Sequence, residues 1–289
     1  RWALNLLVEV VFGLGFIRYK THPGVFRFIE KKLAEFIRQE IPDPGLQQKL
    51  TPKYAYFCKR PSFSNTFYAS LRRPNVELVT DPIARVTKRG IVTADGKERE
   101  VDALVCATGY QVFNRKCVPG YELIGRGGVN LGELWETQRF QAYEGATVPG
   151  IPNLFRFMGP YSTAGLSYFT MIDVESKHLT RCLAEAKRRR TNYFEVRREA
   201  HERDLAKVRR RAEQTVFAGN NCAGSNSYYV DAWGDAPGIR PVTGFEHWLN
   251  SRLFPLSDYA FEPISGPASA PAPGPVSRPS SEPARASVH

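Results

Sequence analysis

The segment VDALVCATGY, residues 101–110, dominates the expected fold. Residues 101–106 form an almost continuous apolar run of strand length, which Thr108 and Gly109 close. Such a run between turn residues is typical of a strand that is buried on both faces of a sheet. A terminal glycine lets the backbone turn sharply or approach a ligand, and ligands of open α/β sheets bind beyond the carboxyl ends of the strands. The segment therefore predicts an α/β fold with a cofactor site near Gly109.

A second junction of this kind lies downstream. The apolar run Asn153–Met158 predicts a strand, which leads into Gly159-Pro160 and a helix from about Ser167 to Arg190. Free N–H groups at a helix N-terminus suit a phosphate or a developing negative charge. Each junction alone is more typical of a glycine that is needed only for packing.

Local patterns predict the elements around these junctions. Residues 1–50 look helical, and the amphipathic stretch Phe26–Ile37 ends before the stop signal at residues 41–45, IPDPG. Further expected elements are the strands Val76–Val79, Ile83–Thr87 and Gly90–Thr93, a hairpin at Asp95-Gly96, and a helix from about Tyr193 to Phe217. The tail, residues 263–289, is rich in Pro, Ala and Ser, so we expect it to be disordered.

The composition excludes several classes of protein. The 289 residues are 42% hydrophobic, and five dispersed cysteines without a CxxC pair argue against a disulfide scaffold and a zinc site. This usage fits a reducing, cytoplasmic setting. No run of about 20 apolar residues predicts a membrane span. The stretch Trp2–Ile17 favours a core-packing helix, with peripheral contact to a membrane or a partner as the alternative.

The net charge of +11 is concentrated between Arg181 and Arg211. Basic runs there suggest binding to nucleic acid or to an acidic membrane. The glutamates and the aspartate interspersed at helical spacing favour a solvated helix face instead, and we therefore expect no nucleic-acid partner.

Four segments occur together in one order: Lys59-Arg60 in YAYFCKRPSF, the sheet segment from Arg73 to Gly96, VDALVCATGY, and IPNLFRFMGPYS with its following helix. In this combination the chain resembles the flavin-dependent monooxygenases, specifically the Baeyer–Villiger branch and its flavin-containing relatives. The resemblance covers most of residues 50–235.

The resemblance implies two Rossmann-like dinucleotide-binding domains, one for FAD and one for NADPH. The glycine-rich GxGxxG motifs of that fold are missing, and the chain begins at Arg1 without Met. We therefore expect a fragment that lacks the N-terminal FAD-binding half. Its expected parts are the end of the NADPH domain in residues 1–108, the end of the FAD domain in residues 109–262, and the tail.

The chemistry implied by the resemblance starts with the reduction of FAD by NADPH. Reduced FAD captures O₂ as a C4a-peroxyflavin, and one oxygen passes to a small organic substrate, either beside a ketone carbonyl or onto nitrogen or sulfur. Arg60 matches the active-site arginine, whose permanent charge suits an anionic intermediate. The resemblance implies cofactor contacts at Lys59, Thr108, Gly109, Gly159, Ser162, Leu166 and Tyr228, the last being Tyr where many members carry Trp.

Each of these residues also has a purely structural explanation. Lys59 and Arg60 could be an exposed pair after a loop, Ser162 a helix cap, and Tyr228 part of a loop boundary. Two other functions stay open: a flavin disulfide reductase, which would need a redox cysteine pair, and a non-catalytic remnant or basic interaction protein. No metal site is expected, and the oligomeric state is left open.

Overall fold

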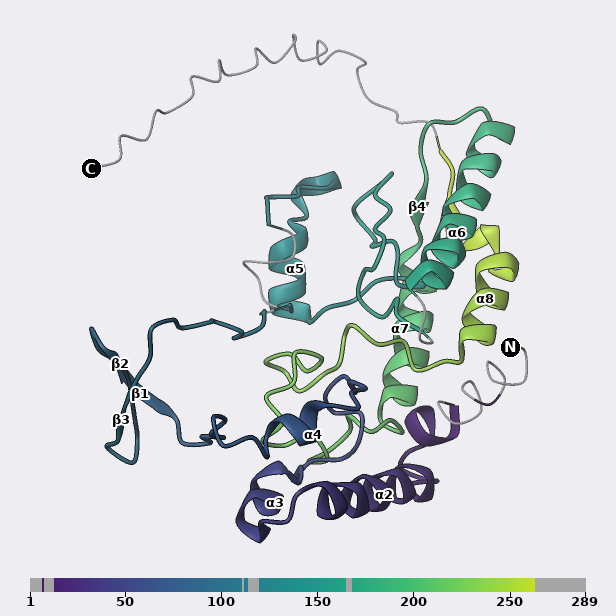
Figure 1. Cartoon of the computed structure of the whole chain (residues 1–289). Helices are drawn as coiled ribbons and strands as arrows, with labels where there is room; N and C mark the ends of the chain where they lie inside the picture. Colours follow the sequence, from purple (N-terminus) through teal and green to yellow (C-terminus); the bar gives the residue numbers. More distant parts are fainter. Residues whose placement is uncertain (1–6, 8–12, 111, 114–119, 165–167, 263–289) are drawn as a thin grey trace.

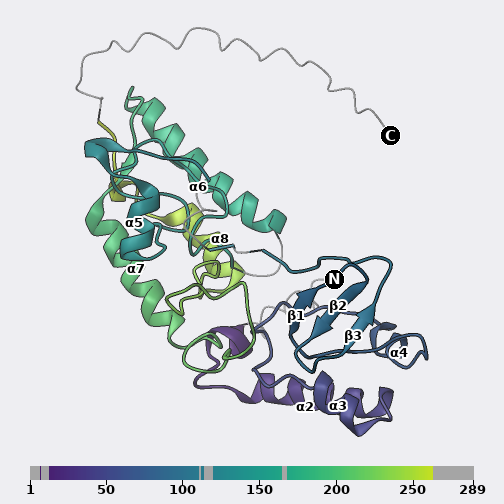
Figure 2. The same cartoon turned by 90° about the vertical axis from the view of Figure 1, so that its left-hand side faces the viewer.

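The computed structural model describes residue 7 and residues 13–110, 112–113, 120–164 and 168–262. Figures 1 and 2 show a small sheet that lies well apart from the long helices α6 and α7. The first half of the chain contains η1 (Gly13–Ile17), α2 (Gly24–Glu40), α3 (Pro44–Leu50), α4 (Phe67–Ser70), β1 (Ile83–Val86), β2 (Gly90–Thr93) and β3 (Glu98–Glu100). The second half contains η2 (Arg126–Gly128), α5 (Leu131–Gln138), α6 (Tyr168–Arg188), β4 (Glu195–Val196), α7 (Arg198–Ala212), α8 (Gly244–Leu253), η3 (Leu256–Asp258) and β5 (Tyr259–Ala260).

Helices α2 and α3 lie where the sequence pattern predicts helix. Helix α2 ends at Glu40, and Ile41 is extended, as the residue before a proline prefers. The Asp43 carboxylate then accepts the N–H groups of Gly45 and Leu46 at 3.2 and 3.0 Å, and so caps α3. The predicted stop signal therefore ends one helix and begins the next.

Most of the expected N-terminal helix Trp2–Ile17, like the tail at residues 263–289, lies outside the described residues. Within the described part, η1 is a short π-helical turn that buries Phe16. None of the helices in the described ranges is long and apolar enough to cross a membrane.

The sheet confirms two of the predicted strands and the predicted hairpin. Strand β2 pairs antiparallel with both β1 and β3. The turn after β2 has Gly96 at φ +81°, a conformation that favours glycine. At Gly90 a side chain would not fit, because its Cβ would lie 1.9 Å from the Arg99 carbonyl oxygen.

The predicted strand Val76–Val79 is wrong, because the structure assigns no strand to these residues. The Val76 N–H is bonded at 3.0 Å to the Arg73 carbonyl oxygen in a turn. Side chains alone connect this segment to the sheet, where the Arg99 guanidinium lies 3.4 Å from the Glu77 carboxylate.

The buried strand predicted from residues 101–107 is also wrong. All ten residues of the VDALVCATGY segment are exposed, and Val105 reaches 86% exposure. A strand buried on both faces needs paired neighbours, and no strand among the described residues pairs with this one. The expected turn is present, because Gly109 has φ +79°.

The predicted strand Asn153–Met158 is an irregular loop. Asn153 and Met158 both have φ +57°, in the left-handed region that a strand cannot contain. Asn153 exchanges two hydrogen bonds with the Phe194 backbone, at 2.9 Å from its N–H and at 3.0 Å to its side-chain oxygen. The Arg156 N–H donates to the Ala146 carbonyl at 2.9 Å. The loop is therefore held by two different segments.

The two predicted downstream helices correspond to α6 and α7. The expected start of α6 at Ser167 lies outside the described residues, whereas the expected start of α7 at Tyr193 is wrong. Residues 195 and 196 form β4, which pairs antiparallel with β5. The Arg197 N–H extends this pairing to the Asp258 carbonyl at 2.8 Å, and the helix begins only after it.

The basic runs behave as a solvated helix face. Arg188 and Arg189 each lie 2.6 Å from the Glu185 carboxylate on α6. Arg211 on α7 lies 2.6 Å from Glu246 on α8. These contacts support the interpretation of mixed charges at helical spacing.

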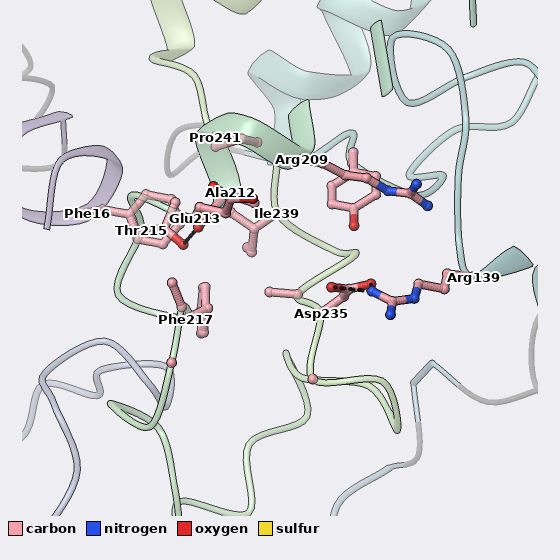
Figure 3. Close-up of a pocket in the computed structure, with 15 residues that line it drawn as sticks. Phe16, Arg139, Arg209, Ala212, Glu213, Thr215, Phe217, Asp235, Ile239 and Pro241 are labelled. Atoms are coloured by element: carbon pink, nitrogen blue, oxygen red, sulfur yellow. Dashed lines mark hydrogen bonds and ion pairs between the residues drawn. The ribbon is translucent and has the colours of Figure 1, made fainter. Parts of the chain in front are cut away.

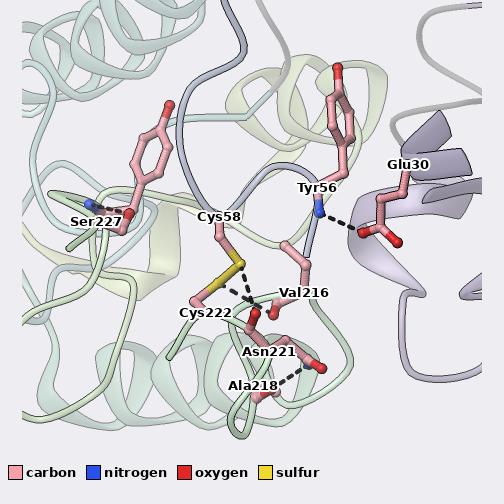
Figure 4. The surroundings of a disulfide bond; sticks show 9 residues. Glu30, Tyr56, Cys58, Val216, Ala218, Asn221, Cys222 and Ser227 are labelled. Carbon is pink, nitrogen blue, oxygen red and sulfur yellow. Dashed lines mark hydrogen bonds between the residues drawn. A yellow bond between two sulfur atoms is a disulfide. The ribbon is translucent and has the colours of Figure 1, made fainter. Parts of the chain in front are cut away.

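A disulfide joins Cys58 to Cys222, 164 residues apart in the sequence (Figure 4). Its surroundings are an aromatic core that includes Phe16, Phe217 and Tyr229. The dispersed cysteines argue against a disulfide scaffold, and the structure corrects this expectation for one pair, because pairing depends on spatial proximity and not on spacing. The cysteine usage no longer supports a reducing compartment.

A buried ion cluster joins α7 to three loops. The Arg240 guanidinium is fully buried, and its Nη2 lies 2.7 Å from Asp204 Oδ1 and 2.8 Å from Glu144 Oε2. Nη1 donates to the Tyr161 carbonyl at 3.4 Å, and the Arg240 N–H donates to the Thr163 carbonyl at 2.8 Å. Burial raises the pKa of Glu144 to about 7. At Asp204 burial acts in the same direction, but the Arg240 charge together with the hydrogen bonds from Arg240 and the Glu144 N–H lowers the pKa of that carboxyl.

Glu175 on α6 holds the turn that follows the Asn153–Met158 loop. Its buried carboxylate accepts the Met158 N–H, with oxygen distances of 3.2 and 3.1 Å, and it lies against the Ser162 side chain. Burial raises the pKa of Glu175 to about 7, although these two contacts act in the opposite direction. The left-handed Met158 is therefore anchored to a long helix.

Replacing Arg240 tests the ion cluster. Arg240→Met leaves two carboxylates buried without their cation, so we expect the free energy of unfolding to fall by about 3–5 kcal/mol in urea titrations. The matched control is Arg139→Met, because Arg139 forms an exposed pair with Asp235 at 3.2 Å. This control should lose less than about 1 kcal/mol. Equally small losses in both variants would contradict the structural role of Arg240.

The raised pKa of Glu175 makes stability depend on pH. The folded protein holds this proton more tightly than the unfolded chain, so the stability contributed by the protonated form is lost as pH rises from 4.5 through about 7. Glu175→Gln removes that loss, and we expect it to be more stable than wild type by at most about 3 kcal/mol at pH 8. Urea unfolding at pH 5 and pH 8 measures the difference. A gap between variant and wild type that does not change with pH would show that Glu175 is not responsible.

Candidate functional site

Three of the sequence-predicted site residues, Arg60, Gly159 and Tyr228, line one cavity of about 220 Å³. The cavity lies where the segment after the disulfide meets the turn that Glu175 anchors. We call it the Arg60 cavity. Its walls are largely apolar and aromatic, and they consist of Phe57, Arg60, Val112, Phe113, Arg156, Met158, Gly159, Pro160, Thr163, Tyr168, Met171, Tyr228, Tyr229, Gly238 and Ile239.

Two tyrosines stand beside the guanidinium of Arg60. A hydrogen bond with the Tyr229 side chain is the main cause that raises the pKa of Arg60. Burial, supported by Tyr228, raises the pKa of Tyr229 to about 12, so this phenol stays neutral. The two tyrosine rings lie 4.5 Å apart. The cavity therefore presents a permanent cation that the neutral Tyr229 hydroxyl orients.

Gly159 is needed for a close approach of two backbones. A Cβ at Gly159 would lie 2.3 Å from the Gly145 carbonyl oxygen. Gly145 in turn leaves no room for a side chain, because its Cβ would lie 2.5 Å from Ser162 Cα. The packing explanation for Gly159 is thus correct, and the same close packing brings its turn to the cavity wall.

The structure does not bring the other predicted residues to the cavity wall. Lys59 is exposed and stands 5.9 Å from the Tyr54 ring centroid. Thr108 and Gly109 are exposed in the VDALVCATGY segment. Ser162 is fully buried, and its hydroxyl lacks a well-aligned hydrogen-bond partner among the described residues. Leu166 lies outside the described residues.

Sequence reasoning missed several wall residues, which share no motif. Arg156 and Met158 come from the supposed strand, whereas Tyr168 and Met171 come from the first turns of α6. The one available signal was Arg156, a charged residue inside an apolar run. Tyr229 was noticed in the sequence only as the neighbour of Tyr228.

The Arg60 cavity fits the ring system of a flavin or a nicotinamide. Aromatic walls can pack against a flat ring, and Arg60 can stabilise negative charge that develops on it. A glycine-rich loop that would bind the phosphate groups is missing from this sequence, because it contains no GxGxxG motif after a strand. A metal is not implied: no cluster of three or more His, Cys, Asp or Glu suited to a metal occurs among the described residues.

A second cavity, of about 320 Å³, lies on the other side of Ile239 and contains none of the predicted residues (Figure 3). Phe16 and Phe217 form an apolar side, and the Arg139–Asp235 ion pair closes the opposite side. Its lining contains two arginines and two carboxylates, so it stabilises negative charge on a bound ring less than the Arg60 cavity does.

Known proteins with related sequences are monooxygenases. The chain is 31% identical over 244 residues to a Baeyer–Villiger monooxygenase of Pseudomonas aeruginosa, covering 84% of this chain and 43% of that protein. It is 32% identical to a Baeyer–Villiger monooxygenase of Streptomyces coelicolor, covering 83% and 46%. A FAD-binding monooxygenase of Aspergillus niger is 36% identical, covering 76% and 35%. The chain thus spans less than half the length of these curated relatives. No protein-family model matches it.

Solved structures with the same fold carry similar names. A steroid monooxygenase bound to NADP matches with a TM-score of 0.69 and 27% identity, covering 79% of this chain and 43% of that one. A cyclohexanone monooxygenase from Rhodococcus sp. Phi1, bound to NADP+, matches with a TM-score of 0.66 and 26% identity, covering 82% and 44%. The fold is therefore a partial FAD- and NADP-binding flavoprotein fold, as the sequence predicts. On this sequence and fold evidence, the chain belongs to the Baeyer–Villiger and related FAD-binding monooxygenases, of which it spans a part.

Proposed function

We propose that this chain forms part of a FAD- and NADPH-dependent monooxygenase that transfers one oxygen atom of O₂ to a small ketone. The observation that supports the proposal is the meeting of Arg60, Gly159 and Tyr228 at one cavity. These residues were predicted from separate motifs. Gly159 lies 99 positions after Arg60 in the sequence, and Tyr228 lies 69 positions after Gly159. The names of the relatives favour ketone oxidation over transfer to nitrogen or sulfur.

The residues of this chain have distinct tasks in the proposal. FAD, when bound, supplies the redox and oxygen chemistry. Arg60 keeps its positive charge at every physiological pH and stabilises negative charge that develops in the cavity. The neutral Tyr229 hydroxyl holds the guanidinium in place. Arg60 itself is exposed on the cavity wall, so its charge can be approached from outside the described residues.

The remaining predicted residues belong to the proposal as cofactor contacts. Lys59, Ser162 and Leu166 are assigned to the cofactors together with Thr108 and Gly109. We assign residues 1–108 to the NADPH-binding domain and residues 109–262 to the FAD-binding domain. The boundary lies within the VDALVCATGY segment, which is exposed and pairs with no strand among the described residues.

Replacing Arg60 tests the proposed function in the complete, FAD-loaded protein. Arg60→Met should retain bound flavin and lose about 100- to 1,000-fold in the rate of oxygenated product, because it removes the one oriented cation beside Tyr229. Product formation and flavin absorbance are measured together. Arg85→Met is the control, since Arg85 is exposed on β1 and lies outside the cavity. Unchanged product yield in Arg60→Met would remove Arg60 from the mechanism.

A further inference from the structure

The Arg60 cavity carries two cations and no acidic side chain. Arg60 and Arg156 both line it, and no Asp or Glu belongs to its described wall. Like charges in one cavity repel each other, and an anion that binds there relieves the repulsion. The cavity is therefore electrostatically suited to an anion.

Among the described residues, Arg156 lacks the ionic partners that the buried Arg240 has. Its guanidinium stands 5.1 Å from the Trp135 ring centroid, and Trp135 is buried. No carboxylate among the described residues lies within ion-pair distance of Arg156, and its side chain donates no hydrogen bond there. The fully buried Arg240, in contrast, contacts two carboxylates.

A partly buried cation without a counterion is costly to the fold. Burial lowers the pKa of Arg156, which reflects this cost. A guanidinium presents a planar set of donors that matches a carboxylate in a bidentate geometry. Stacking on Trp135 also holds the guanidinium plane in place, which reduces the entropy lost when an anion binds.

We propose that the Arg60 cavity selects substrates that carry a carboxylate, and that Arg156 binds this carboxylate. The inference rests on the proposed function and adds the class of substrate: a keto acid whose carbonyl group lies toward Arg60. Apolar wall residues such as Phe57, Met171 and Ile239 contact the hydrocarbon part between the two polar ends. Arg156 is thus a specificity-determining residue.

A binding titration tests the assignment without relying on turnover. The complete, FAD-loaded protein is titrated by calorimetry with 4-oxocyclohexanecarboxylate and with its neutral methyl ester. Wild type should bind the acid more tightly than the ester. Arg156→Met should weaken binding of the acid by about 10- to 100-fold and leave the ester unchanged, because only the acid makes a charge-assisted contact. Arg156→Lys should restore part of the affinity, since it keeps the charge but not the planar fork.

A matched control separates the anion contact from stacking. Arg252 also stands over a tryptophan, 4.1 Å from the Trp248 ring centroid, but it lies outside the cavity wall. Arg252→Met should bind both ligands as wild type does. If Arg156→Met weakened the acid and the ester equally, the role of Arg156 would be structural support of Trp135 and the proposal would be wrong.

Two further outcomes would overturn the proposal. Loss of NADPH binding in Arg156→Met, with the affinity for the acid unchanged, would assign Arg156 to a cofactor phosphate. Wild type that binds the acid no better than the ester, while NADPH still reduces its flavin, would refute the inference and leave the proposed function intact. Failure of that flavin reduction in wild type, with the acid still preferred, would count against the proposed function alone.

Discussion

The buried contact of Arg240 with Asp204 and Glu144 is the constraint on which the second half of the structure depends. A guanidinium withdrawn completely from water must keep its counterions, so α7 and the Glu144 loop cannot move independently. The same residue fixes the segment from Tyr161 to Thr163 through its backbone contacts. The turn that lines the Arg60 cavity is therefore built onto an ionic anchor.

The opposite side of the cavity has a covalent anchor. The disulfide between Cys58 and Cys222 joins the segment that carries Arg60 to the loop that carries Tyr228 and Tyr229. An aromatic core surrounds the disulfide, with Cys58 fully buried and Cys222 partly buried. Arg60 and Tyr228 are 168 positions apart in the sequence, yet both line the Arg60 cavity. The disulfide explains this, because Cys58 lies two residues before Arg60 and Cys222 lies six residues before Tyr228. The cavity combines one ionic and one covalent constraint, and neither requires a regular sheet.

Local patterns predicted the elements that depend on near neighbours. Helix α2, its stop signal and the β2–β3 hairpin follow from capping residues, prolines and glycines within a few positions, and all are present. The two apolar runs that looked like strands failed for different physical reasons. Residues 101–107 have no strand beside them among the described residues. The run from Asn153 contains two left-handed residues, which Phe194 and Glu175 hold from distant parts of the chain.

The sequence by itself determined the family, because motifs in a fixed order survive even where the secondary structure assigned to them is wrong. It also predicted Arg60 as a site residue, since a guanidinium keeps its charge in any surroundings. Only the tertiary structure decided that Gly159 and Tyr228 join Arg60 while Lys59 and Thr108 do not. It alone revealed the disulfide and an Arg156 that has no carboxylate partner among the described residues, because such partners depend on position in space and not on distance along the sequence.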